Sequence, residues 1–196
     1  QKARYNEIVH VTINEDDEIC LIPCLDEDHG GIQFNQLPKE SVIARELQTK
    51  RWFFPMLNDQ RRNELYEVAI RKAAATLSHE ERNVLDIGSG TGLLAMLAAK
   101  FFECKVTSVE MSSPLRELAR QTVKDNKLEH LVTVLGCHST EINIDRVNVC
   151  LSELLEDGLL GEGWLPTMRD AWHRLLTPNS IVIPQRARLF GQIVQA

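Results

Sequence analysis

The feature that most constrains the fold is an alternation of short apolar runs with helical stretches between residues 84 and 183. The apolar runs read VLDI, VTSV, VTVL, VNVCL and SIVI, and the stretches LLAMLAAKFF, PLRELARQTVKDN and PTMRDAWHRLL lie between them. Short runs bounded by Gly, Asp or Pro and separated by helices are typical of βαβ units. We therefore predict an α/β fold with a mostly parallel sheet and helices on both of its faces.

Two further segments precede this alternation. Residues 57–77, LNDQRRNELYEVAIRKAAATL, predict a helix of about twenty residues, with Asn58 or Asp59 as its cap. The expected inner face of this helix consists of Leu65, Val68, Ala69, Lys72 and Ala73. The first fifty residues carry EIVHVTI and ICLIPCL around the acidic turn NEDDE, which indicates an N-terminal β-hairpin extension.

Charge and hydropathy narrow the class of partner. A formal net charge of −6 argues against direct nucleic-acid binding, which needs a basic face. It suits a cationic partner, although the same modest charge also serves solubility alone. No apolar run reaches the roughly 20 residues of a membrane span, and the first residues lack the pattern of a signal peptide. We expect no membrane association.

The cysteines indicate the compartment. Five cysteines, an odd and scattered set, do not make a disulfide framework and favour a reducing environment. We expect a cytoplasmic location, a nuclear location or both. Cys20, Cys24 and His29 resemble half of a zinc site, but no second ligand pair follows at the required spacing, so we predict no bound metal.

A glycine-rich turn follows the first run of the alternation. VLDIGSGTGLL places Gly88, Gly90 and Gly92 between a predicted strand and a predicted helix, where a backbone without Cβ atoms can approach a ligand. The spacing is not that of a dinucleotide fingerprint, and the lysine of a phosphate-binding loop is missing. Asp86, just before the turn, can bond the turn amides or a cationic ligand group.

Glu110 ends the next run, about twenty residues after the glycines, as expected of an acid that binds two ribose hydroxyls. The alternative is that Glu110 caps the helix that starts near Pro114. A nucleoside held without a phosphate site points to S-adenosylmethionine as cofactor, with S-adenosylhomocysteine as its product.

These residues resemble the class I methyltransferases, whose Rossmann-like domain holds S-adenosylmethionine at such a turn. Upstream, MLNDQRRNELY is similar to a helix-opening motif of the protein arginine methyltransferases. By this resemblance Arg62 binds the cofactor carboxylate, which a guanidinium matches in a bidentate way; the alternative is a solvated arginine. The resemblance also implies that Met56 lies beside the cofactor sulfur and Phe53 in the lid over the cofactor.

The stretch SELLEDGLLGEG, residues 152–163, resembles the double-E loop of the same family. Glu153 and Glu162 lie nine positions apart, as the two catalytic glutamates of that loop do. A guanidinium keeps its proton to a pKa above about 12, so two carboxylates can orient it and hold its charge while one nitrogen receives the methyl group. Glu156 and Asp157 are interpreted as solvated acids that set the local field.

The resemblance is narrower at two places. HSTE, residues 138–141, and the glycine that follows Glu162 are similar to the type III branch of the family, whose members stop at monomethylarginine. Ser139 and Glu141 are therefore expected at the adenine.

Together the resemblance spans residues 52–195 and implies an S-adenosylmethionine-dependent protein arginine N-methyltransferase, with monomethylation favoured. It implies Arg/Gly-rich tails or histones as substrates, and a homodimer or pseudo-dimer. Residues 1–50 would be an N-terminal extension, 51–190 the cofactor-binding domain and 191–196 the start of the family's β-barrel domain. The family's Tyr-Phe-x-x-Tyr signature is missing. The alternatives are a class I methyltransferase of a small molecule and a non-catalytic partner subunit that binds the cofactor.

Overall fold

The computed structural model describes residues 9–13, 19–23, 53–156, 159 and 161–193. They belong to two units, residues 1–58 and residues 59–196. In the first unit, β1 (Val9–Ile13) pairs antiparallel with β2 (Ile19–Pro23), and the short helix α2 spans Phe53–Leu57. The predicted N-terminal β-hairpin is therefore present.

The second unit is built on a sheet of five strands whose neighbours are all parallel, within the part of the chain that the structure describes. In chain order the strands are β3 (Val84–Ile87), β4 (Val106–Val109), β5 (Val132–Leu135), β6 (Val147–Ser152) and β7 (Leu176–Ile183). Their order across the sheet is β5-β4-β3-β6-β7. The chain therefore starts at the centre, builds one half and then crosses to the other, which confirms the predicted parallel α/β fold.

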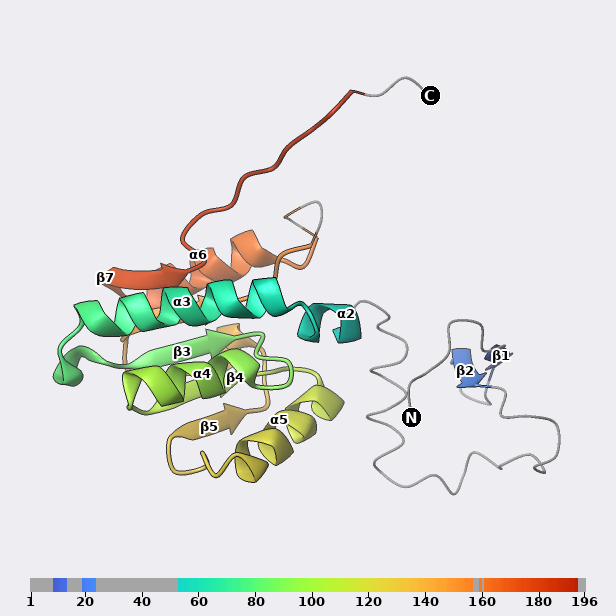
Figure 1. The fold of residues 1–196 in the computed structure, drawn as a ribbon, viewed down its shortest axis with the longest axis horizontal. Helices are drawn as coiled ribbons and strands as arrows, with labels where there is room; N and C mark the ends of the chain where they lie inside the picture. Colours follow the sequence, from blue (N-terminus) through green and yellow to red (C-terminus); the bar gives the residue numbers. More distant parts are fainter. Residues whose placement is uncertain (1–8, 14–18, 24–52, 157–158, 160, 194–196) are drawn as a thin grey trace. The chain divides into compact units, whose positions relative to one another are not determined.

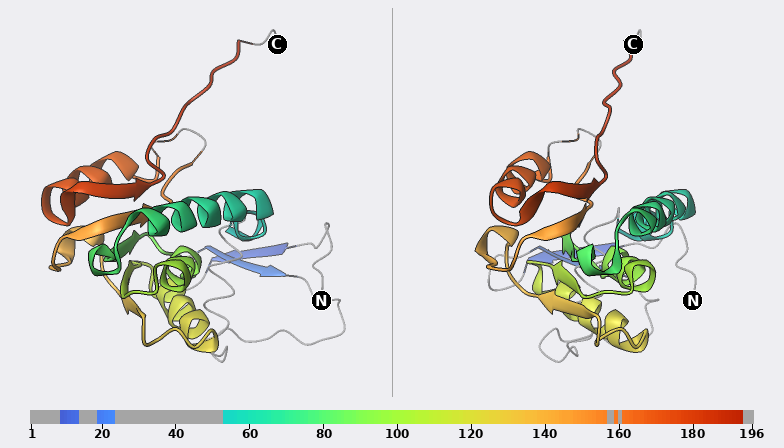
Figure 2. Two further views of the ribbon diagram at one scale, coloured as in Figure 1. Left: turned by 60° about the vertical axis from the view of Figure 1, so that its left-hand side comes forward. Right: turned by 90° about the vertical axis from the view of Figure 1, so that its left-hand side faces the viewer.

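Helices cover both faces of this sheet (Figure 1). One face carries α3 (Gln60–Thr76), α4 (Leu93–Phe102) and α5 (Ser113–Asp125), and the other carries α6 (Trp164–Arg174), as the right-hand view of Figure 2 shows. Two single-turn helices, η2 (His79–Glu81) and η3 (Ser139–Glu141), lie in the connections. No helix in the described ranges is both long and apolar enough to span a membrane.

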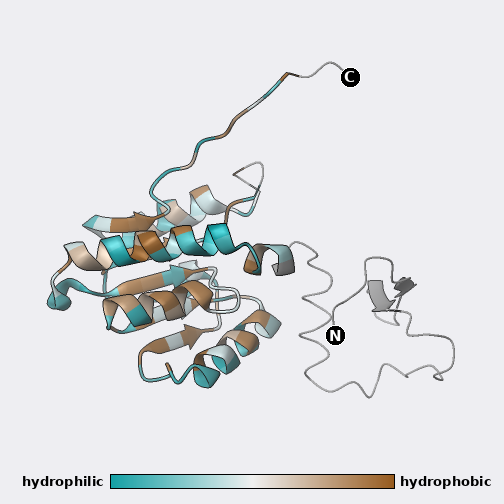
Figure 3. Cartoon of the chain, viewed as in Figure 1, coloured by the Kyte–Doolittle hydropathy of each residue, from teal (hydrophilic) through white to brown (hydrophobic). Residues whose placement is uncertain are grey.

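Two apolar clusters join these layers. The first packs α3 and α4 onto the sheet through residues such as Ala95, Phe102 and Val149, and the second packs α6 onto the opposite face through Met168 and Ala171. The central strand β3 is buried at all four positions because both of its faces are covered, as in parallel sheets generally. In Figure 3 the strands are brown, and so hydrophobic, over part of their length.

The N-terminus of α3 is as predicted. Asp59 is the N-cap, and its Oδ1 accepts a hydrogen bond from the backbone N–H of Arg62 at 2.9 Å. This bond satisfies one of the amides that the first turn of a helix leaves free. The cap therefore sets where the helix starts, and with it the position of Arg62.

The predicted inner face of α3 is wrong at Leu65, Val68 and Lys72, which are all exposed. Leu65 is 61% exposed and Val68 43% exposed, whereas Ile70, Ala73 and Ala74 are buried. The buried residues lie in the second half of the helix, and α3 packs against α4. The packing of α4 against α3 thus decides which residues of α3 are buried. The hydropathy pattern alone could not locate that contact.

Candidate functional site

Three of the predicted site residues follow directly on neighbouring strands. The register aligns the last residues of β3, β4 and β6, so the residues that come next, Gly88, Glu110 and Glu153, emerge side by side at the carboxyl edge of the sheet. From β3 the chain proceeds to β4 on one side and reaches β6 on the other side only later. This edge is therefore the topological switch point, where ligands of open α/β sheets bind.

The glycine turn has the conformation that glycine allows. Gly88 and Gly92 have φ of +73° and +83°, in the left-handed region that other residues rarely adopt. A Cβ atom on Gly88 would lie 2.5 Å from Cδ2 of Leu154, a residue of the predicted double-E loop. Gly92 is the N-cap of α4. The first glycine of the turn therefore packs against the predicted double-E loop, and the last glycine begins α4.

Glu110 is fixed by backbone amides. It is 7% exposed, its Oε2 accepts from the N–H of Gly90 at 2.9 Å, and its Oε1 accepts from the N–H of Ser112 at 2.7 Å. Ser112 is the N-cap of α5, so the capping alternative holds in part. A carboxylate has about four acceptor positions, so each oxygen keeps capacity for a hydroxyl donor.

Asp86 is a buried acid inside the sheet. Its side chain is inaccessible to solvent, and neither carboxylate oxygen has a hydrogen bond. Burial raises the pKa of Asp86 to about 7, the negative charge of Glu110 adds to the rise, and the Ala95 amide opposes it. Asp86 lies within β3 and is closed to solvent, so its contact with a ligand group stays a prediction.

Arg62 and Glu153 form an ion pair across 91 positions of sequence, with Nη2 of Arg62 donating to Oε2 of Glu153 at 2.8 Å. Each side chain is 18% exposed. The pair joins the start of α3 to the double-E loop, and it brings together the two residues predicted to bind the cofactor carboxylate and the substrate guanidinium.

Sequence reasoning missed the residues that orient Arg62. Nη1 of Arg62 donates to Oδ1 of Asn63 at 2.9 Å, and its guanidinium lies 5.2 Å from the centre of the Tyr66 ring. Burial raises the pKa of the Tyr66 hydroxyl, and the charge of Glu153 raises it further. The hydroxyl therefore stays protonated and can donate a hydrogen bond. Tyr66 lies one helical turn after Arg62, a spacing that could have revealed it.

The double-E loop contains an internal support. Oε1 of Glu156 accepts from the N–H of Gly161 at 3.0 Å, and the Leu159 N–H donates to the carbonyl of Glu156 at 2.8 Å. Glu156 is therefore more than a solvated acid, because it ties the two sides of the loop. Glu162 is exposed in the turn that precedes α6. Asp157 lies outside the described residues.

Two buried polar atoms flank this loop without a hydrogen-bond partner in the described structure. They are Oγ of Ser152 and Nε1 of Trp164. Unpaired buried polar atoms are uncommon in folded proteins, and both lie next in sequence to an expected ligand-binding segment. Ser152 could have been found from the sequence, because it is a serine at the end of an apolar run.

The HSTE segment forms η3. Ser139 is buried, whereas Glu141 is exposed, and the His138 side chain accepts from the N–H of Thr140. The segment follows β5, so it lies in the connection that leads towards β6. Ser139 has the enclosed position expected of a residue that lines a ligand, and Glu141 lies at the rim.

Two predicted cofactor contacts belong to the other unit. Phe53 and Met56 lie in α2, within residues 1–58, and their proximity to the cofactor stays a prediction. In the ranges described, no group of three or more His, Cys, Asp or Glu side chains could hold a metal ion. Cys24 and His29 lie outside those ranges.

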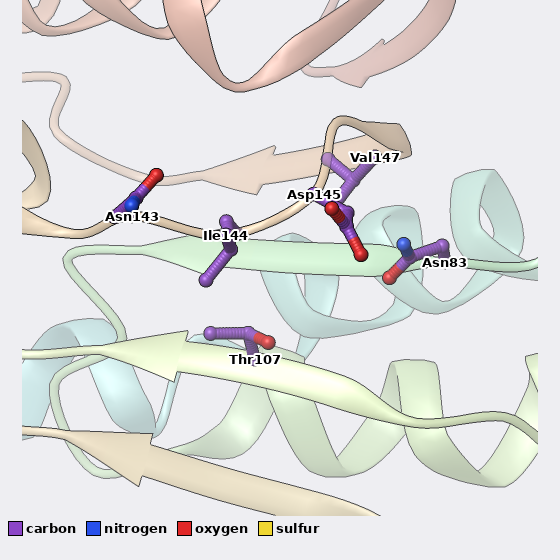
Figure 4. Close-up of a pocket in the computed structure, with 6 residues that line it drawn as sticks. All are labelled: Asn83, Thr107, Asn143, Ile144, Asp145 and Val147. Carbon is purple, nitrogen blue, oxygen red and sulfur yellow. The ribbon is translucent and has the colours of Figure 1, made fainter.

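A separate hollow lies towards the amino ends of the strands, away from the glycine turn. It has a volume of about 490 Å³ and is lined by Asn83, Thr107, Asn143, Ile144, Asp145 and Val147 (Figure 4). None of the predicted site residues lines it.

Comparison with known proteins agrees with this geometry. A family model described as "Methyltransferase domain" matches residues 84–179. The arginine N(omega)-methyltransferase of Streptomyces achromogenes subsp. streptozoticus is 41% identical over 154 residues, which cover 74% of this chain and 41% of the relative. Human protein arginine N-methyltransferase 9 is 38% identical over 163 residues, covering 74% and 19%. Protein arginine N-methyltransferase 7 of Oryza sativa subsp. indica is 34% identical over 157 residues, covering 74% and 21%.

Solved structures give the same result. The Trypanosoma brucei PRMT1 enzyme–prozyme heterotetrameric complex with AdoHcy matches with a TM-score of 0.60 and 35% identity, over 65% of this chain and 39% of that one. The chain thus spans between about a fifth and two fifths of the length of these relatives. Within that span, it carries a methyltransferase domain and is similar to the protein arginine N-methyltransferases.

Proposed function

We propose that this protein is an S-adenosylmethionine-dependent protein arginine N-methyltransferase, which transfers a methyl group to the guanidinium of arginine in basic protein substrates. The observation that carries the proposal is the ion pair between Arg62 and Glu153 at the switch point of the sheet. It shows a carboxylate of the double-E loop that already binds a guanidinium, 2.8 Å away and largely shielded from water.

The residues at the carboxyl edge suit the cofactor. Glu110 would bind the two ribose hydroxyls with the acceptor capacity that the amides of Gly90 and Ser112 leave free. The turn at Gly88, Gly90 and Gly92 leaves the backbone open to close approach. Asp86 is an unpaired acid behind that turn, and Arg62 would take the carboxylate of the cofactor. The cofactor supplies an electrophilic methyl group on a sulfonium.

The double-E loop suits a guanidinium substrate. Glu153 and Glu162 would accept its N–H groups, orient one nitrogen and draw the positive charge towards the others. That polarisation makes the reacting nitrogen more nucleophilic. The proton leaves late, to a carboxylate or to water, because the methylated product is still a guanidinium.

The ion pair between Arg62 and Glu153 should couple the binding of the cofactor to the binding of the arginine substrate. As long as Arg62 holds Glu153, neither is fully available to a ligand. A carboxylate ligand on Arg62 releases Glu153, and a guanidinium on Glu153 releases Arg62. Each ligand should therefore help the other to bind, which is a reciprocal coupling.

The finer assignments are also proposals. HSTE and the glycine after Glu162 support monomethylation, and the acidic loop supports Arg/Gly-rich tails or histones as substrates. A homodimer or pseudo-dimer and a β-barrel beginning at residues 191–196 follow from the family resemblance. A cytoplasmic or nuclear location follows from the odd and scattered set of cysteines.

The test is methylation of an Arg-rich peptide by the full-length protein with labelled S-adenosylmethionine, followed by hydrolysis and identification of the product. We expect labelled monomethylarginine. Dimethylarginine would contradict the type III assignment, and label only on a small molecule would contradict the protein substrate. Glu162→Gln should abolish transfer and keep cofactor binding. The matched control is Glu156→Gln, which removes a charge from the same loop but keeps an acceptor for Gly161.

A further inference from the structure

The connection between β5 and β6, residues 136–146, is unusual for a parallel sheet because it contains no α-helix. Its regular structure is η3, which carries the segment expected at the adenine. Crossovers between parallel strands commonly use a helix, which satisfies its own backbone groups. Here the carbonyls of the connection need other donors, because buried backbone groups are nearly always paired.

One guanidinium supplies two of these donors. Arg174, in the last turn of α6, donates from Nη1 to the carbonyl of Ile142 at 2.9 Å and from Nη2 to the carbonyl of Ser139 at 3.0 Å. Ser139 and Ile142 are both buried, at 4% and 5% exposure. A single side chain thus binds both ends of the turn formed by residues 139–142.

Arg174 is itself held in place. Its Nε donates to Oδ1 of Asp170 at 2.8 Å, and its Nη2 donates to Oδ2 of the same carboxylate. Asp170 lies one turn earlier in α6, so one helix face carries both members of the pair. A planar guanidinium can bind a carboxylate and two carbonyls at once, whereas a lysine ammonium lacks that fixed fork.

We propose that Arg174 is a positioning residue for adenine recognition, which holds Ser139 and Glu141 in the orientation that reads the base. The inference rests on the proposed function. The effect of Arg174 should be confined to the adenine end of the cofactor, because Glu110 and Arg62, the expected partners of the ribose and the carboxylate, are supported by other residues. Glu110 is held by Gly90 and Ser112, and Arg62 is held by α3 and Glu153.

The test uses two ligands that differ only in the base. S-adenosylhomocysteine and S-inosylhomocysteine, in which an oxygen replaces the amino group of adenine, are titrated calorimetrically into the full-length protein and its Arg174→Lys variant. The wild type should prefer the adenine ligand. The variant should bind it about tenfold more weakly, for the loss of one or two charge-assisted hydrogen bonds, and should bind the inosine ligand nearly as the wild type does. The preference should therefore shrink.

Arg146→Lys is the matched control. Arg146 also donates to two backbone carbonyls, those of Leu176 and His173, but it does not contact the carbonyls of Ser139 and Ile142. The Arg146→Lys variant should leave the preference for the adenine ligand over the inosine ligand unchanged. An equal loss of affinity for both ligands in Arg174→Lys, or the same change of preference in Arg146→Lys, would show a merely structural role and overturn the inference.

Two further outcomes separate the inference from the proposed function. Should Arg174→Lys fail to fold, Asp170→Asn keeps the arginine, weakens its support and should reduce the preference in the same direction. A wild type that binds both ligands equally overturns the role of Arg174 and leaves the methyltransferase function standing. A wild type that binds neither overturns both.

Discussion

Glu110 and Glu153 follow β4 and β6, the two strands that flank β3, at the same edge of the sheet, yet they are held in different ways. Glu110 is bound by two backbone amides and is 7% exposed. Glu153 is bound by the side chain of Arg62, and its own side chain is 18% exposed. Backbone donors stay in place when a ligand arrives, whereas a side-chain partner can turn away. The first carboxylate is therefore preorganised for one ligand, and the second can exchange its partner.

Of the changes at these two carboxylates, the larger effect is expected for Glu153→Gln. The variant loses the charge that holds a substrate guanidinium, so turnover of an Arg-rich peptide should fall about a thousandfold, the scale on which loss of one preorganised electrostatic group acts. Affinity for S-adenosylhomocysteine should stay equal or rise, because Arg62 loses its internal partner. Steady-state rates with labelled cofactor and calorimetry measure the two quantities. Turnover within tenfold of the wild type would remove Glu153 from the reaction.

Glu110→Gln should show the opposite pattern. The amide that replaces the carboxylate offers one acceptor oxygen, so the N–H of either Gly90 or Ser112 loses its partner. Affinity for S-adenosylhomocysteine should fall about a hundredfold, since a hydrogen bond to a charged group contributes about 1.5–3 kcal/mol. The control is Glu117→Gln, an exposed acid on α5 that pairs with Arg120. A change below threefold would mean that Glu110 is only a helix cap.

Sequence alone located the strands and the two carboxylates because apolar runs and the residues that end them are local signals. It also located Asp59, since a capping side chain acts within three residues. The ion pair between Arg62 and Glu153 joins positions 91 residues apart, and no local pattern encodes that distance. The inner face of α3 was mispredicted for the same reason, because the position of α4 decides which side is buried.

Asp86→Asn tests the buried acid behind the glycine turn. In the folded protein its pKa is raised to about 7, well above the unfolded value of about 3.9. Between these values the unfolded chain is ionised and the folded chain keeps the proton, so stability falls as pH rises and levels off above about 7. The wild type should lose about 2 kcal/mol between pH 5 and pH 7 that the variant keeps.

Amide hydrogen exchange of β3, corrected for the intrinsic effect of pH, measures this difference as a free energy of opening. Asp125→Asn is the control, because Asp125 is an exposed acid at the end of α5. Equal pH dependence in the wild type and in Asp86→Asn would mean that Asp86 is ionised in the folded protein.

The smallest effect is expected for Gly88→Ala, which probes the contact between the glycine turn and Leu154. The new Cβ atom meets Leu154 at 2.5 Å and sits at a φ of +73°, but the Leu154 side chain is flexible and can turn away. The cost should be about 1–2 kcal/mol, mostly backbone strain, seen as faster amide exchange in β3. Gly191→Ala, with no atom within 4 Å of its Cβ position, should change nothing. Adding Leu154→Ala should recover only the steric part of the loss. Full recovery would mean that contact with the double-E loop, rather than the left-handed backbone, is what requires glycine at this position.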